Sequence, residues 1–494
     1  MAQQSTRQER KRKEAEKQFA KALALHQAGK LEEAVRAYER TLRDNPQKFE
    51  AQANLGLIYE TNQKDKAIAA YEEAFLLAPR DPRLGDKLSR LYIETGNFAK
   101  AKILLKDLLE LEEKNWQAAL LLGRLHKQDH EFDLAFSYYE KVALWQPDLA
   151  EAYAEMGNIS RYSLKETEAL AYFRQAIDKD PENAEYHGYL LEALLYFGHL
   201  PEGFKELEWR KKLPKGKDFY DQFDQNLPQW QGEIFSGKKL LIYCEEGLGD
   251  TVQFVRYLPL VKLRGGHVTL ACQKPLLRLF EALPGVDAVV NSCEWKDYDL
   301  SVALLSLPMI FGTSLATIPA STPYIKTPRP LVTAWQEKLA ALSGPKIGVI
   351  WSGNSHNTCH IGDLAPLSEL AKVNFVSLQK GTGASEWPEK PAALSMINLD
   401  EELSDFADTA AVMLNLDLII STDTSTAHLA GALGRPVLTL LSEEADWRWL
   451  AKRTDSPWYP TMRLVRKEPT ESWLDLWRRV AQGIEKNFMI ERDR

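Results

Sequence analysis

Two short polar turns carry the residue types from which a group-transfer reaction could be built. The first, Glu245-Glu246-Gly247-Leu248-Gly249-Asp250, follows an apolar run and leads into an amphipathic segment. Glycines at such a junction let a ligand approach the backbone, and a carboxylate there can serve as a general base. The third glycine of the dinucleotide fingerprint is missing, because Val252 occupies its place. We therefore expect Asp250 to be a base, with N-capping of the following helix as the alternative.

The second turn, Asp423-Thr424-Ser425-Thr426, lies between an apolar run and a helical pattern. Free backbone N–H groups, hydroxyls and the positive end of a helix suit a diphosphate. One helix cap needs one such residue, so the excess favours an anion site over simple N-capping. His428, a little into the helix, is either a structural histidine or a ligand contact.

The segments around these turns alternate short apolar runs with helical patterns. A proline-bearing linker divides the alternation, which predicts two doubly wound, Rossmann-like domains, residues 238–330 and 345–482, facing a common cleft. In such sheets ligands bind beyond the carboxyl ends of the strands, where both turns lie. The strands expected are Leu240–Cys244, His267–Cys272, Asp287–Val290, Leu300–Leu304, Lys346–Trp351, Asn374–Leu378, Leu416–Ile420 and Pro436–Leu441.

Two further polar residues follow one of the expected strands. Gln379 and Lys380 come directly after Asn374–Leu378. They are candidates for contacts with the ribose or base of a nucleotide, and a solvated strand end is an equal alternative. The intervening helices are expected at Gln253–Leu263 and Pro275–Leu283, and a linking helix at Val332–Leu342.

The first half of the chain is a repeat. Glycine, alanine, aromatic and proline positions recur with a period of ~34 residues, the length of the tetratricopeptide helix-turn-helix unit. Small residues such as Gly56, Gly123 and Gly157 would let the second helix of each unit approach the first. About six units over residues 15–214 predict an α-solenoid with a concave face. That face is either a groove for a protein partner or a scaffold for dimerisation or for the second half.

Composition narrows the class of protein. The 494 residues are 45% hydrophobic and 27% charged, which is typical of a globular chain with about three domains. The net charge of -8 argues against a nucleic-acid binder. Four scattered cysteines favour a reducing compartment. Because no signal-peptide core and no run of ~18 apolar residues is present, we expect a cytoplasmic protein without a transmembrane segment.

Three motifs carry a family resemblance. GLGDTVQFVRYLP, the tetrapeptide Trp351-Ser352-Gly353-Asn354, and DTSTAHLAGALGRPV occur in this order. Over roughly residues 200 to 480 the chain resembles bacterial glycosyltransferase family 9, which includes the lipopolysaccharide heptosyltransferases. The stretches DWRWL and DSPWYPTMRLVR are similar to the tetratricopeptide-fused members, and comparable fusions occur among bacterial flagellin glycosyltransferases.

The resemblance implies a GT-B fold and an inverting sugar transfer from a nucleotide-diphosphate sugar, with no cofactor and no metal. It assigns Asp250 as general base and Asp423 to the neighbourhood of the donor sugar. It assigns the phosphates to Thr424, Ser425 and Thr426. The remaining donor-site candidates are Gly247, Gly249, Ser352, Asn354, Gln379, Lys380 and His428.

One departure from the family pattern concerns charge. Relatives carry a basic run after Trp-Ser-Gly-Asn, whereas residues 355–363 here hold no Lys or Arg. Either His360 or Arg435 substitutes, or activity is reduced, or the domain has become a binding module. A metal site at His356, Cys359 and His360 is disfavoured, because the set is short and lacks a fourth ligand.

The sequence thus predicts a cytoplasmic inverting glycosyltransferase whose solenoid recruits a protein acceptor, such as a flagellin-like surface protein. The alternatives are a heptosyltransferase-like enzyme acting on lipopolysaccharide or another glycan, and a degenerate transferase acting as a scaffold. Trp447, Trp449 and Trp458 are expected to pack the C-terminal helix back across the cleft, with Trp458 a candidate for stacking on a sugar.

Overall fold

The computed structural model describes residues 2–214, 216–292, 294–353, 359–370 and 372–488. The chain divides into two compact units, Met1–Glu182 and Asn183–Arg494. Among the described residues, no helix is both long enough and apolar enough to cross a membrane.

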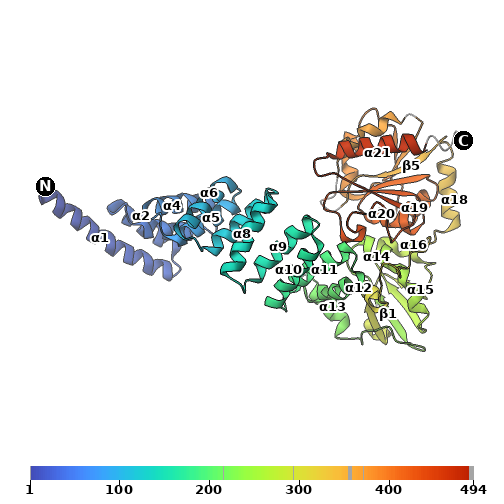
Figure 1. Ribbon diagram of the computed structural model, residues 1–494, viewed down its shortest axis with the longest axis horizontal. Helices are drawn as coiled ribbons and strands as arrows, with labels where there is room; N and C mark the ends of the chain where they lie inside the picture. The colour runs from blue at the N-terminus through green and yellow to red at the C-terminus, as the bar shows by residue number, and fades with distance from the viewer. Residues whose placement is uncertain (1, 215, 293, 354–358, 371, 489–494) are drawn as a thin grey trace. The chain divides into compact units, whose positions relative to one another are not determined.

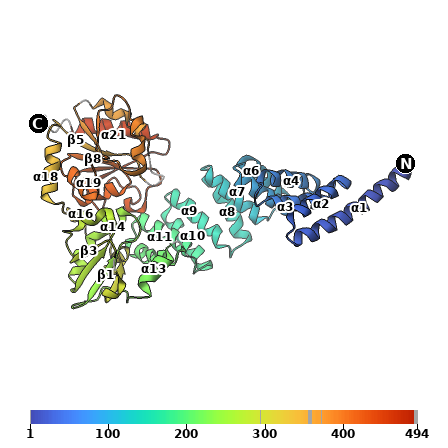
Figure 2. The same cartoon turned by 180° about the vertical axis from the view of Figure 1, so that it is seen from behind.

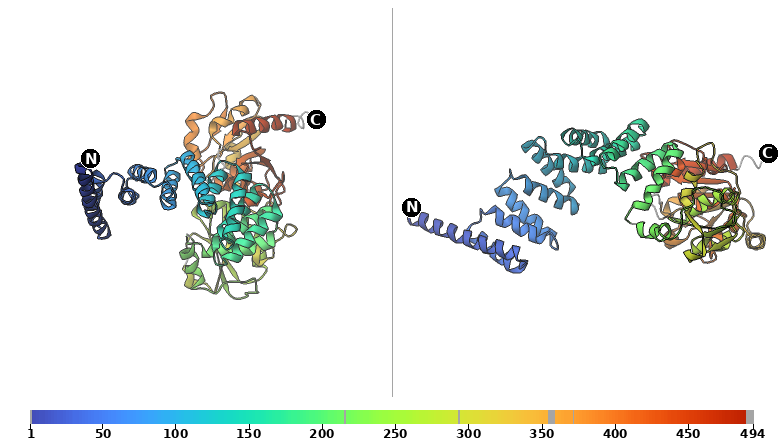
Figure 3. Two further views of the ribbon diagram at one scale, coloured as in Figure 1. Left: turned by 60° about the vertical axis from the view of Figure 1, so that its left-hand side comes forward. Right: turned by 90° about the horizontal axis from the view of Figure 1, so that it is seen from below.

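The first unit is an array of antiparallel helix pairs, drawn from blue to blue-green in Figure 1. Successive pairs stack side by side along the array, as the right-hand view of Figure 3 shows. This arrangement confirms the tetratricopeptide-like fold. The helices are α1 (Ala2–Gln27), α2 (Leu31–Asp44), α3 (Phe49–Tyr59), α4 (Lys64–Leu77), α5 (Pro82–Glu94), α6 (Phe98–Leu111), α7 (Trp116–Gln128), α8 (Phe132–Trp145), α9 (Ala150–Tyr162) and α10 (Glu166–Lys179).

Glycine and an aromatic ring meet within several pairs, as the repeat pattern predicts. A Cβ atom on Gly123 of α7 would lie 2.6 Å from the Tyr139 ring of α8. Gly157 of α9 stands at the same distance from the Phe173 ring of α10. Both rings are fully buried, so the absence of a side chain on the first helix sets the spacing of the pair.

The second unit begins with further helices and a parallel sheet. The helices are α11 (Ala184–Phe197), α12 (Leu200–Glu206), η1 (Leu207–Lys212) and α13 (Lys217–Asp224), so the end of the predicted repeat region, which runs to residue 214, lies in this unit. The first sheet has the order β3-β2-β1-β4 and is parallel throughout. Its strands are β1 (Lys239–Tyr243), β2 (His267–Ala271), β3 (Ala288–Val290) and β4 (Leu300–Ala303), and Figure 2 labels β1 and β3.

The first helix after β1 starts earlier than predicted. Instead of one helix over Gln253–Leu263, the chain forms α14 (Leu248–Phe254), η2 (Val255–Tyr257) and α15 (Leu258–Lys262). The early start has a local cause, because the Asp250 carboxylate accepts a hydrogen bond from the Gly247 N–H and so caps the first turn. The other helical segments here are η3 (Lys274–Leu276), α16 (Leu277–Phe280), η4 (Trp295–Asp297), η5 (Leu304–Ser306) and α17 (Leu307–Ile310).

The second sheet has the order β10-β9-β8-β5-β6-β7 and is also parallel. Read from β7, this is the doubly wound order 3-2-1-4-5-6, with its switch point between β5 and β8. The strands are β5 (Lys346–Ile350), β6 (Asn374–Ser377), β7 (Met396–Asn398), β8 (Leu418–Thr422), β9 (Val437–Leu441) and β10 (Met462–Arg466). The accompanying helices are α18 (Arg329–Lys338), η6 (Ile361–Glu369), η7 (Gly381–Glu389), α19 (Phe406–Met413), α20 (Ser425–Ala432), η8 (Trp447–Trp449) and α21 (Trp473–Phe488).

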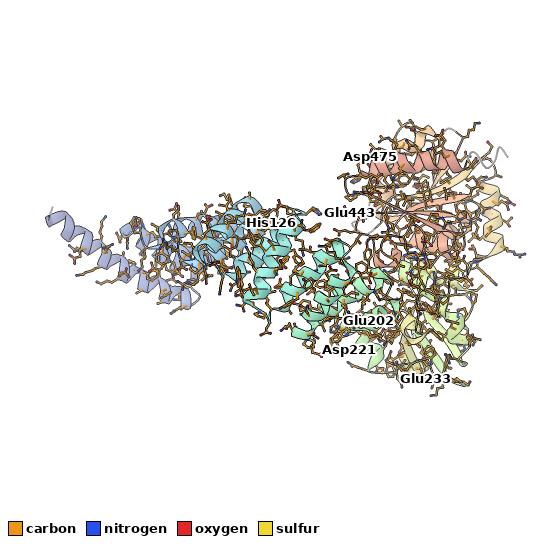
Figure 4. The ribbon with its side chains drawn as sticks, viewed as in Figure 1. His126, Glu202, Asp221, Glu233, Glu443 and Asp475 are labelled. Carbon is orange, nitrogen blue, oxygen red and sulfur yellow. The ribbon has the colours of Figure 1, made fainter. Side chains whose placement is uncertain are left out.

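Helix α21 covers one face of the second sheet. Its apolar stripe, which includes Leu476, Trp477 and Val480, is buried against residues of β5 and β8. At its start the Asp475 carboxylate, labelled in Figure 4, accepts a 2.6 Å hydrogen bond from the Ser472 hydroxyl. The Ser472 oxygen in turn accepts from the Asp475 N–H. This capping fixes where the helix begins.

Candidate functional site

A cleft of about 980 Å³ lies in the second unit, at the carboxyl ends of β1, β5, β6 and β8. It is lined by the glycine turn after β1, the loop after β5, the loop after β6 and the turn after β8. The lining therefore combines both predicted turns. Its residues are Glu246, Gly247, Leu248, Gly249, Asp250, Gln273, Ile350, Ser352, Gly353, Leu378, Gln379, Lys380, Gly381, Phe406, Thr409, Asp423, Thr424, Ser425, Thr426, His428, Asp446 and Arg448.

The glycine turn packs directly against α20. A Cβ atom on Gly249 would lie 3.0 Å from His428 Cδ2 and 3.4 Å from the Ser425 Cα atom. A side chain on Gly249 would press on the His428 ring, which would have to shift by a few tenths of an ångström. Gly247 is the N-cap of α14, with φ −81° and ψ 165°. The two helix starts, α14 and α20, are thereby held against each other.

Asp250 has two hydrogen-bond partners within this arrangement. Its Oδ2 accepts from the Gly247 N–H at 2.9 Å, which is the capping role that the sequence left as an alternative. Its Oδ1 accepts from Nη2 of Arg448 and forms an ion pair with that guanidinium. Asp250 thus caps α14 and also lines the cleft. Its use as a base remains a prediction.

The turn after β8 presents backbone donors to the cleft. Thr424 is the N-cap of α20, but its side chain makes no capping hydrogen bond, and its hydroxyl instead meets the Ser421 hydroxyl at 2.9 Å. The amides of Ser425 and Thr426 have no acceptor within the described part of the chain. A helix start with unpaired N–H groups is the arrangement that binds phosphate.

Asp423 lies at the carboxyl end of β8 beside those amides. Burial raises its pKa to about 6, and the carboxylates of Asp446 and Asp250 add to the effect. The indole of Trp449 and the Arg448 guanidinium act in the opposite direction. A carboxyl group with this pKa is present in both protonation states near neutral pH, so it can either donate or accept a hydrogen bond.

The His428 side chain lines the cleft, and two aromatic residues hold it in place. Its Nδ1 is 2.9 Å from the Tyr459 hydroxyl, and its ring stacks on Trp449 with the centroids 5.0 Å apart. Burial, with Arg448 and Arg256 nearby, lowers its pKa well below the ordinary value. The imidazole is therefore neutral. Its contacts with Tyr459 and Trp449 are those of a structural histidine, and a ligand contact stays a prediction.

Arg448 is a functional candidate that the sequence analysis missed. It lies in η8, within the DWRWL stretch that served only as a family marker. Its guanidinium is bonded to Asp250, to Asp446 at 2.8 Å and to Gln253 at 3.0 Å. Burial alone would lower the pKa of Arg448, but the carboxylates of Asp250 and Asp446 raise it above its ordinary value.

The predicted donor-site residues that follow β5 and β6 differ in how far other residues already engage their side chains. Gln379 is buried, and its amide accepts from the N–H groups of Trp351 and Ser352 and donates to the carbonyls of Ser352 and Lys380. Lys380 is half exposed and pairs with Asp400 at 3.0 Å. Ser352 lines the cleft, and Asn354 lies outside the described residues.

Neither predicted substitute for the missing basic run lines the cleft. The His360 side chain is 84% exposed and faces Glu386 at 3.4 Å. Arg435 donates to the Leu416 carbonyl. Of the residues considered for a metal, His356 lies outside the described residues, and the Cys359 thiol donates to the Trp351 carbonyl at 3.1 Å. The described residues contain no group of three potential metal ligands.

The prediction that Trp447, Trp449 and Trp458 pack the C-terminal helix is wrong, because they belong to the core that contains α14 and α20, whereas α21 packs into a separate core. Trp449 and Trp458 are fully buried. Trp458 contacts Phe204, Phe254 and Trp447 edge to face. The suggestion that Trp458 stacks on a sugar is wrong, because its ring is enclosed by other aromatic side chains.

Two family matches fall on the two parts of the chain. Residues 402–469 match glycosyltransferase family 9 (heptosyltransferase). This segment runs from α19 to β10 and carries Asp423, Ser425 and Arg448. Residues 17–137, within the helical array, match a domain of unknown function (DUF7017).

The chain is also similar to individual proteins. It is 26% identical over 507 residues to Protein FlbA of Caulobacter vibrioides, covering 94% of this chain and 83% of FlbA. It is 26% identical over 169 residues to mouse Protein O-mannosyl-transferase TMTC1, covering 34% of this chain but only 15% of that protein. The crystal structure of YrrB, a TPR protein, aligns with a TM-score of 0.32 at 22% identity, covering 34% of this chain and 88% of YrrB.

The family 9 match covers the third of the three motifs, DTSTAHLAGALGRPV, and lies in the second unit. The chain joins a tetratricopeptide-like helical array to an α/β region, and residues 402–469 of that region match glycosyltransferase family 9.

Proposed function

We propose that the protein is an inverting, metal-independent glycosyltransferase with a GT-B arrangement of its two sheets. One observation carries the proposal: the unpaired amides of Ser425 and Thr426 line the same cleft as the Asp250 carboxylate. The first feature suits the diphosphate of a nucleotide sugar and the second suits an acceptor hydroxyl. The family 9 match over residues 402–469 supports the same assignment.

The reaction joins these two features in a single displacement. The acceptor oxygen forms a bond to the anomeric carbon as its proton passes to Asp250. The bond from that carbon to the diphosphate oxygen breaks, and its electron pair leaves with the nucleoside diphosphate. The amides at the start of α20 stabilise the charge that develops on the leaving group. Attack opposite the leaving group inverts the configuration.

Asp423 and the walls of the cleft would orient the donor. With its pKa at about 6, Asp423 can hydrogen-bond a sugar hydroxyl in either protonation state. Lys380 reaches the cleft from the β6 side, and Gln379 shapes the wall through its backbone contacts. Neither role calls for a metal or a bound cofactor.

The acceptor we favour is a protein held by the tetratricopeptide-like array, such as a flagellin-like surface protein. Solenoids of this kind offer extended concave surfaces, which is the feature that favours a protein over a free glycan. A heptosyltransferase-like reaction on lipopolysaccharide or another glycan is the second candidate, and the family 9 description is what favours it. The reaction would take place in the cytoplasm, in keeping with the few scattered cysteines.

The test is turnover of nucleotide sugars by the full-length chain. A panel of uridine, guanosine, cytidine and adenosine diphosphate sugars would be incubated with the protein, and released nucleoside diphosphate would be measured. We expect one class of donor to be consumed, and the Asp250→Ala variant to lose that activity. Asp297→Ala, at an exposed position in η4, is the matched control and should retain it. No consumption of any donor would favour the degenerate scaffold.

A further inference from the structure

The charges of the cleft pose a problem for an anionic donor. Asp250, Asp423 and Asp446 all line it. A diphosphate brought among three carboxylates would be repelled in a partly buried site. The permanent positive charges among the described lining residues belong to Lys380 and Arg448. The Lys380 side chain is 50% exposed, whereas that of Arg448 is 15% exposed, so Arg448 is the cation that is less screened by solvent.

The contacts of Arg448 leave it able to take another anion. Nε donates to the Gln253 side chain, Nη1 to Asp446 and Nη2 to Asp250. A guanidinium has five N–H groups. Two of those of Arg448 therefore have no acceptor among the described residues. The Arg448 side chain is 15% exposed, and its guanidinium lies 4.2 Å from the centroid of the Trp447 ring.

Asp250 poses the complementary problem. Its Oδ2 accepts from Gly247 and its Oδ1 accepts from Arg448. With one oxygen held by the Gly247 N–H and the other held by the Arg448 guanidinium, the carboxylate is not free to accept from an acceptor hydroxyl. If Asp250 is the base, the ion pair must open before the acceptor hydroxyl is deprotonated.

One movement would resolve both problems. We propose that Arg448 binds the diphosphate of the donor and leaves Asp250 as it does so, which frees the base when the donor is present. This inference rests on the proposed glycosyl transfer. Arginine binds phosphate through two parallel N–H groups, and a diphosphate carries more charge than one carboxylate. Arg448 also supplies the cation that the sequence lacks after Trp351-Ser352-Gly353-Asn354.

The experiment is a double-mutant cycle on binding by the full-length protein. Uridine, guanosine, cytidine and adenosine diphosphates would be titrated into wild type, Arg448→Gln, Asp250→Asn and the double variant by calorimetry. Arg448→Gln should weaken binding about 10- to 100-fold, the range for a charge-assisted hydrogen bond. Asp250→Asn should tighten it about 3- to 10-fold, because the competitor for Arg448 loses its charge.

The double variant distinguishes two effects of Asp250: competition with the diphosphate for Arg448, and direct repulsion of the diphosphate. If Asp250 acts through Arg448, the tightening by Asp250→Asn should vanish when Arg448 is Gln. If the carboxylate merely repels the ligand, the same tightening would appear in both backgrounds and would overturn the release step. Arg453→Gln, at an arginine whose salt bridge to Asp455 lies outside the cleft lining, is the control and should bind as wild type does.

The outcomes distinguish this inference from the proposed function. Binding by wild type that Arg448→Gln leaves unchanged would overturn the role of Arg448 alone. Binding of none of the four diphosphates by wild type would overturn the proposed function and the inference with it. If Arg448→Gln does not fold, Arg448→Lys can replace it. This variant keeps the positive charge but loses the bidentate contact, so it should bind the diphosphate about fivefold more weakly than wild type does.

Discussion

Gly249 and His428 are in contact at the point where the two helix starts of the cleft meet. A Cβ atom on Gly249 would stand 3.0 Å from His428 Cδ2, and the His428 ring is itself held by Tyr459 and Trp449. The glycine turn thus packs against a histidine whose ring is held in place by two aromatic neighbours. The distance between the expected base and the expected phosphate site depends on this contact.

Gly249→Ala should therefore disturb the cleft. The added methyl group presses on His428 and on the backbone of Ser425, so we expect about 1–3 kcal/mol of lost stability, the usual cost of overpacking. Binding of nucleoside diphosphates should weaken in parallel. Chemical denaturation and calorimetry measure the two effects. Gly483→Ala on α21, where a Cβ meets nothing within 4 Å, should instead add about 0.5–1 kcal/mol.

Gly123→Ala should destabilise the helical array. Its Cβ atom would lie 2.6 Å from the Tyr139 ring, which is fully buried and cannot swing away. We expect a loss of about 1–3 kcal/mol from overpacking, seen as an earlier transition in urea by circular dichroism. Gly188→Ala on α11, with open space around the new Cβ, is the matched control. Equal stability of the two variants would contradict the close approach of α7 and α8.

Asp423 should make stability depend on pH. Because its pKa is raised to about 6 from an ordinary 3.8, the folded state favours the protonated form. The advantage is complete below the ordinary value and disappears as the pH rises through about 6. Relative to Asp423→Asn, wild type should lose about 2–3 kcal/mol of unfolding free energy between about pH 3 and pH 7. A difference between the two proteins that stays constant with pH would show that Asp423 titrates normally.

Arg210 and Glu245 form a buried ion pair directly before the glycine turn. Nη2 of Arg210 is 2.8 Å from Glu245 Oε1, and the Glu245 carboxylate also accepts from the N–H groups of Leu304 and Leu305. Removing the guanidinium leaves this carboxylate buried without its charge partner. Arg210→Met should therefore cost about 3–5 kcal/mol. The double variant Arg210→Met/Glu245→Gln should recover part of the loss in denaturant unfolding, and a larger loss in the double variant would show that the pair is not coupled.

Local patterns were enough to predict the repeats, eight strands and both turns. Each of these features has a direct signal along the sequence: the regular spacing of the repeats, the apolar runs of the strands and the clusters of polar residues in the turns. Two strands escaped this approach. β7 has only three residues, and β10 carries Arg463 and Arg466 within its five. Their strand conformation depends on pairing with β6 and β9.

The parts of the site that sequence reasoning missed depend on residues distant in the chain. Arg448 meets Asp250 only because η8 and α14 reach the same cleft. Gln379 has the side chain of a ligand contact, but its amide is engaged by the backbone at Trp351 and Ser352. Those partners follow from the pairing of β5 with β6. A single sequence does not specify such neighbours.

The most direct measurement for the central claim is a crystal structure of the full-length chain with the nucleoside diphosphate that it binds. If the proposed function is right, phosphate oxygens will lie within hydrogen-bonding distance of the Ser425 and Thr426 amides, in the cleft that Asp250 lines. A diphosphate bound elsewhere on the protein, with those amides still unpaired, would contradict it.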